Sequence, residues 1–78
     1  MKTHWETQNG FKNHYIDIRD KNLYIWENYE GDAHTEMGGM CSFEEFISGK
    51  FHTIIQSVFG PHILDEILDM VKILNSQR

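Results

Sequence analysis

The chain has 78 residues, of which 40% are hydrophobic and 13% aromatic, which is too apolar for a disordered segment and fits a single domain over residues 1–78. Twelve acidic side chains against seven basic ones give a net charge of −5, which argues against nucleic acid or an anionic membrane as a partner. The single cysteine excludes an intrachain disulfide. The sequence also shows no signal peptide and no apolar run long enough to span a membrane, so we expect a cytoplasmic protein.

The first ten residues read as a loosely ordered arm. They are polar apart from Met1 and Trp5, and they end in the turn-forming pair Asn9-Gly10. We expect Trp5 to dock this arm on the body of the domain.

Two strands are predicted next, at residues 13–18 and 23–29. The first alternates around Ile16 and Ile18, and the second is rich in aromatic and β-branched residues. The polar residues 19–22 between them predict a hairpin with a four-residue loop built on a type I turn.

The register of this hairpin predicts two different faces. Ile16 lies opposite Ile25 on an aliphatic face that would meet the core. The reverse face carries the other pairs, which are Tyr15 with Trp26 and Asp17 with Tyr24.

A third, weaker strand is predicted at residues 33–37, which completes a three-stranded antiparallel meander over residues 13–37. A short loop before it would place Met37 opposite Ile25. The glycines at 38 and 39 are expected to end the strand as a turn.

Residues 42–75 predict two helices. Ser42 and Glu45 match a capping box, and apolar residues keep helical spacing from there to residue 59, with Gly49 able to soften or split the helix. Gly60 ends the first helix and Pro61 opens the second. Strands followed by helices predict an α+β domain, in which both helices pack on one face of an antiparallel sheet.

The chemistry-bearing side chains suggest no enzyme and no cofactor. No motif of a phosphate-binding loop, a zinc protease or a serine hydrolase is present. Cys41 precedes a helix N-terminus, but a nucleophile also needs an oriented base and a pocket. The donors that could meet at a metal lack the paired spacing of zinc sites, so we expect none there: His34, Glu36, Cys41, His52 and His62.

The reverse face of the sheet carries the functional prediction. If both helices cover the aliphatic face, Tyr15, Tyr24 and Trp26 form an exposed aromatic patch of the kind enriched at interfaces. The alternative is that Trp5 and Phe11 fold over this patch and bury it within the monomer.

Acidic residues are expected to form a rim beside the patch, and these are Glu27, Glu30, Asp32 and Glu36. We therefore predict a non-catalytic protein-interaction module, a regulator or inhibitor that docks a protein partner through the patch and its rim. A homodimer through the same face stays open. The alternatives are an acidic inhibitor that mimics nucleic acid and a small metal-binding domain.

Overall fold

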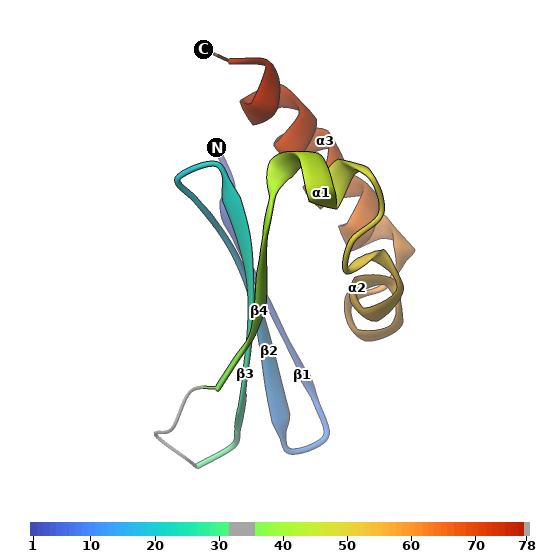
Figure 1. The fold of residues 1–78 in the computed structure, drawn as a ribbon. Helices are drawn as coiled ribbons and strands as arrows, with labels where there is room; N and C mark the ends of the chain where they lie inside the picture. The colour runs from blue at the N-terminus through green and yellow to red at the C-terminus, as the bar shows by residue number, and fades with distance from the viewer. Residues whose placement is uncertain (32–35, 78) are drawn as a thin grey trace.

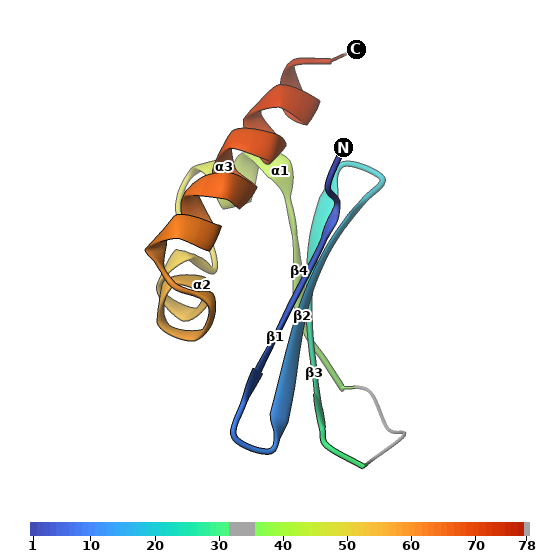
Figure 2. The ribbon, with the colours of Figure 1, turned by 180° about the vertical axis from the view of Figure 1, so that it is seen from behind.

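The computed structural model describes residues 1–31 and 36–77, in which a four-stranded antiparallel sheet carries three helices on one face (Figure 1). The strands run in sequence order across the sheet: β1 (His4–Asn9), β2 (Lys12–Arg19), β3 (Asn22–Tyr29) and β4 (Glu36–Ser42). The helices are α1 (Phe43–Ile47), α2 (His52–Phe59) and α3 (Pro61–Ser76). The view from behind in Figure 2 shows the same two layers, with the helices on one side only. The α+β class is confirmed, but the expected number of strands, three, is wrong.

The fourth strand is β1, in the segment where the sequence suggested a loose arm. β1 pairs antiparallel with β2, and Trp5 lies opposite Ile16. A two-residue turn joins the strands, with Gly10 at φ 65°, as type II′ turns require at their first position. The strand escaped prediction because Trp5 is its one apolar residue, which gives almost no period-two signal.

The β2–β3 hairpin has the predicted register, but its turn differs. Ile16 lies opposite Ile25, and Tyr15 lies opposite Trp26. The loop contains only residues 20 and 21, both with positive φ, at 52° and 64°. This pattern belongs to a type I′ turn, whose twist matches that of the strands better than the expected type I turn does.

Strand β4 continues through the glycines that were expected to end it. A bulge beside Ile25 shifts the register, so Ile25 lies opposite Gly39 and Trp26 opposite Met37, and the predicted pairing of Met37 with Ile25 is wrong. A Cβ atom at Gly39 would lie 2.9 Å from the ring of Phe51. A strand can contain glycine at this position because the ring of Phe51 packs directly against the backbone, where a side chain would have no room.

The capping box at the start of α1 is confirmed. The hydroxyl of Ser42 accepts from the Glu45 N–H at 3.1 Å, and the Glu45 carboxylate accepts from the Ser42 N–H at 3.0 Å. The helix then breaks into α1 and α2 around Gly49, which takes a φ of 122° that no continuing helix allows. No helix in the described part of the chain is long and apolar enough to cross a bilayer.

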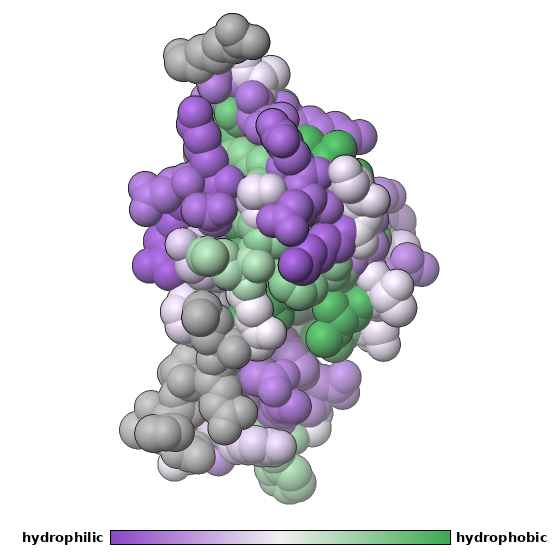
Figure 3. Space-filling view, viewed as in Figure 1, coloured by the Kyte–Doolittle hydropathy of each residue, from purple (hydrophilic) through white to green (hydrophobic). Residues whose placement is uncertain are grey.

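The core lies between the two layers. It includes Trp5 from the first strand, 3% exposed, and Val71 from the last helix, 0% exposed. The remaining buried members are Ile16, Ile18, Leu23, Ile25, Cys41, Phe43, Phe46, Ile55, Leu64 and Ile67. On the face seen in the space-filling view of Figure 3, hydrophilic residues lie around several separate hydrophobic patches.

Candidate functional site

The candidate site is the face of the sheet opposite the helices, here called the open face. Side chains alternate along a strand, so the burial of Trp5, Ile16 and Leu23 on the helical side sends their neighbours to the other side. Strand register then defines the open face: His4, Glu6 and Gln8 from β1, Asn13, Tyr15, Asp17 and Arg19 from β2, Tyr24, Trp26 and Asn28 from β3, and Met40 from β4.

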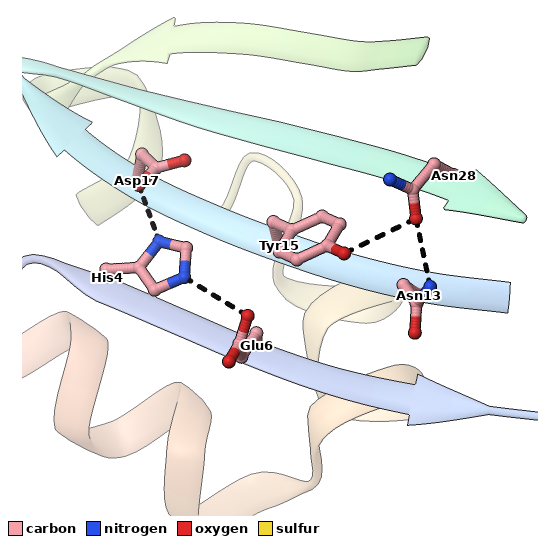
Figure 4. A network of polar contacts seen from close by, with 6 residues as sticks. All are labelled: His4, Glu6, Asn13, Tyr15, Asp17 and Asn28. Atoms are coloured by element: carbon pink, nitrogen blue, oxygen red, sulfur yellow. Dashed lines mark hydrogen bonds and ion pairs between the residues drawn. The ribbon is translucent and has the colours of Figure 1, made fainter. Parts of the chain in front are cut away.

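Tyr15 lies at the centre of this face. Its register partners are Glu6 on β1 and Trp26 on β3, and Asp17 follows two residues along the same strand. Its hydroxyl lies 3.4 Å from the side-chain oxygen of Asn28, to which it donates (Figure 4). The phenol ring is thus bordered by two carboxylates, an indole and an amide.

His4 links the two carboxylates. Its Nδ1 atom lies 2.7 Å from Asp17 Oδ1, and its Nε2 atom lies 3.5 Å from Glu6 Oε2, as the dashed lines in Figure 4 show. The hydrogen bond with Asp17 raises the pKa of His4; burial opposes this shift, and Glu6 reinforces it. The imidazole also stacks beside Tyr15, with ring centroids 6.1 Å apart.

The aromatic residues of β3 form a second part of the open face. Tyr24 and Trp26 stack with their centroids 6.1 Å apart, and the guanidinium of Arg19 lies 4.6 Å from the Tyr24 ring centroid. The indole N–H of Trp26 is buried and has no hydrogen-bond partner in the part of the chain that the structure describes. A buried donor left unpaired costs about 1–3 kcal/mol.

Two shallow depressions hollow the open face on either side of Tyr15. One has a volume of about 510 Å³ and is lined by His4, Tyr15, Asp17, Trp26 and Asn28. The other, of about 330 Å³, is lined by Glu6, Thr7, Gln8, Asn13 and Tyr15. The described residues of this face therefore form a contoured surface with accessible rings and carboxylates and with shallow depressions.

The structure places Tyr15, Tyr24 and Trp26 together on this face, each half-buried, as the hairpin register predicted. The expected cover does not form. Trp5 lies in the core on the opposite side of the sheet, and Phe11 is 79% exposed at the β1–β2 turn. Neither side chain buries the aromatic residues.

The predicted acidic rim is not gathered around them. Glu27 projects from the helix-bearing side of the sheet, where it lines a small apolar groove beside α2 and contacts Lys12 Nζ at 3.0 Å. Glu30 lies near the C-terminal end of β1, where its carboxylate accepts a hydrogen bond from the side-chain amide of Gln8 at 3.2 Å. These two carboxylates belong to different parts of the surface.

Asp32 lies outside the described residues, and the backbone of Glu36 is opposite Glu27. The carboxylates that do border the aromatic residues are Glu6 and Asp17, which the sequence analysis left out of the site. The place of Asp17 follows from the register of the hairpin, whereas Glu6 lies on β1, whose one apolar residue gives almost no alternation signal.

The thiol considered as a nucleophile lies in the core. Cys41 is 3% exposed, and burial raises its pKa, with Glu45 adding to the shift. A buried thiol with a raised pKa stays protonated and unreactive.

Within residues 1–31 and 36–77, the metal donors considered above do not come together. His34 lies outside the described residues. His52 Nε2 lies 2.6 Å from the Phe46 carbonyl oxygen, and His62 is exposed on α3. Among the described residues, no three histidine, cysteine, aspartate or glutamate side chains could hold a metal ion.

Comparison of the chain with protein-family models, with curated proteins and with solved structures finds no match. The open face has to be interpreted from its own chemistry. Aromatic rings offer flat apolar surface and a negative π face, and carboxylates accept hydrogen bonds from cations. Such groups on an accessible surface can bind the side chains of another protein.

Proposed function

We propose that this protein is a small non-catalytic protein-interaction module, a regulator or inhibitor in the cytoplasm, that docks a protein partner through the open face. The observation that carries the proposal is the group of half-buried aromatic residues, Tyr15, Tyr24 and Trp26, on the side of the sheet away from the helices. Tyrosine, tryptophan and arginine are the residues most enriched among those that dominate binding energy. With a net charge of −5, nucleic acid and anionic membrane are not the partners we propose.

The physical basis is the removal of ring surface from water. Burying apolar area stabilises a complex by about 25 cal/mol per Å² before the costs of association. Tyrosine and tryptophan supply this area at a low cost in side-chain entropy. Half-buried rings, already fixed by stacking on one another, lose even less freedom when a partner covers them.

The proposal is tested by Trp26→Ala. Truncation of a central interface tryptophan commonly costs about 2 kcal/mol or more, which corresponds to at least about a 30-fold loss of affinity. The same change should lower the free energy of unfolding by only about 1 kcal/mol, because Trp26 lies outside the core. Affinity capture from native cytosol, paired with thermal melts and the oligomeric mass of the pure protein, measures both effects.

Phe11→Ala is the matched control. It removes an aromatic ring that is 79% exposed but lies at a turn, so partner capture should be unchanged. A Trp26→Ala protein that folds normally, keeps the parent's mass and still captures every partner would refute the proposal. If the open face instead joins two copies, the pure parent protein will have the mass of a dimer and Trp26→Ala will be monomeric.

A further inference from the structure

The open face already binds one guanidinium group, which belongs to its own Arg19. The Arg19 Cζ atom lies 4.6 Å from the ring centroid of Tyr24 and 5.7 Å from that of Trp26. A guanidinium is planar and weakly hydrated, so it stacks on aromatic faces that attract cations. The rings of β3 are thus an intramolecular example of arginine recognition.

The surroundings of Tyr15 repeat this aromatic surface and add negative charge. Glu6 lies opposite Tyr15 across the β1–β2 pair, and Asp17 lies two residues along β2. The side chain of Glu6 is 65% exposed and that of Asp17 is 29% exposed, so both carboxylates can be reached from solvent. A cation placed over Tyr15 would meet the π face of the ring below it and a carboxylate beside it.

The depression beside Tyr15, of about 510 Å³, has room for an arginine side chain and offers groups that can bind one. It is lined by the rings of His4, Tyr15 and Trp26, and Asp17 has a second carboxylate oxygen besides the one bonded to His4, whereas the Asn28 oxygen already accepts from Asn13 and Tyr15. A guanidinium presents five N–H donors in one plane, so it can stack on a ring and donate to a carboxylate at the edge of that ring. We propose that this depression seats an arginine side chain of a basic protein partner, stacked on Tyr15 and donating to Asp17. This inference rests on the proposed function and specifies the chemistry of the partner.

Charge selects a basic protein over a second copy of the chain. Each copy carries a net charge of −5, so two copies of the chain repel one another over the whole molecule. A basic partner is attracted by the same field, which raises its rate of association. Arginine is favoured over lysine because an ammonium group is compact, strongly hydrated and unable to stack as a plane.

The test uses a blocked tripeptide, acetyl-Gly-Arg-Gly-amide, and its lysine and citrulline versions. Citrulline keeps the shape of arginine but has no charge. The indole N–H signals in NMR report the binding, since Trp26 lies on the open face while Trp5 lies in the core with its N–H donated to Glu66. The arginine peptide should shift the Trp26 signal saturably and leave that of Trp5 unmoved. The lysine and citrulline peptides should bind more weakly, citrulline by about tenfold or more.

Asp17→Asn tests the carboxylate. It keeps the size of the side chain and removes its charge, so the affinity for the arginine peptide should fall by about tenfold. Asp69→Asn is the matched control, because it makes the same change at an exposed position of α3 in the helical layer. Its effect should stay within about twofold, since screened charges at a distance contribute little.

Three results would overturn the inference. They are the lack of a saturable Trp26 shift, an equal affinity for the citrulline or lysine peptide, and an unchanged affinity in Asp17→Asn. A pure protein that is dimeric through the open face would overturn it as well. If the arginine peptide does not bind but Trp26→Ala still abolishes capture of a protein partner, the arginine site in the depression is refuted and the proposed function stands.

Discussion

Among single residues, His4 has a contact that should make stability depend on pH. Its Nδ1 atom lies 2.7 Å from Asp17, and this contact ties the edge strand β1 to β2. The hydrogen bond raises the pKa of folded His4 above the 6.5 of an unperturbed histidine. A raised folded-state pKa means that the stabilisation is fully present below about pH 6.5 and is lost as the pH rises through the folded value.

We therefore expect the free energy of unfolding to fall by about 0.5 kcal/mol or less as the pH rises from below 6.5 to above the pKa of folded His4, the magnitude of an exposed ion pair. An NMR titration of the imidazole should give a midpoint above 6.5 in the parent and a lower one in Asp17→Asn. A parent midpoint at or below 6.5 would show that the contact with Asp17 does not form in solution.

At the level of elements, the start of α1 depends on one serine. The helix has five residues, too few to be stable alone, and Ser42 satisfies the N–H of Glu45. Ser42→Ala should cost about 1 kcal/mol of unfolding free energy by chemical denaturation. Ser57→Ala, the same change at an exposed position within α2, should be neutral or slightly stabilising, because alanine is the better helix former. Equal losses in both variants would mean that the cap contributes nothing.

The central hairpin could be predicted, and the two outer strands could not, for physical reasons. In β2 and β3 a period-two pattern marks both faces, so a shift of one residue would bury Asp17 among aliphatic side chains. In β1 a single apolar residue marks the core face. In β4 the glycines have a low intrinsic preference for strands, and they are explained by tertiary packing, of Ile25 against Gly38 and of Phe51 against Gly39.

The candidate site was predictable to the same extent as its strands. Tyr15, Tyr24 and Trp26 follow from the hairpin register alone. Glu6 could not be included, because it reaches the open face from the strand that was missed. Glu27 was assigned to an acidic rim by its place in the sequence, whereas alternation along β3 turns it to the helix-bearing side.

In the whole molecule, Trp5 connects the sheet to the helical layer. It is 3% exposed, and its indole N–H donates to Glu66 of α3 at 3.0 Å. Trp5→Ala should cost about 3–5 kcal/mol, a large part of the stability of a domain this small, and should be visible as a lower denaturation midpoint. Trp5→Phe keeps most of the apolar volume and loses the donor, so a cost of about 1–2 kcal/mol is expected. A loss below about 1 kcal/mol in Trp5→Ala would place the side chain outside the core.

The contact between Trp5 and Glu66 spans 61 residues, and it has a consequence for the order in which the chain can fold. The β2–β3 hairpin closes over a two-residue turn and can form as soon as both strands exist. The first strand, in contrast, is covered by α2 and, through the contact of Trp5 with Glu66, by the last helix. During synthesis the aliphatic side of the sheet is therefore only partly covered, by α1 and α2, until α3 has emerged. A nascent chain halted before that point would leave Trp5 and Ile16 partly exposed to chaperones or to aggregation.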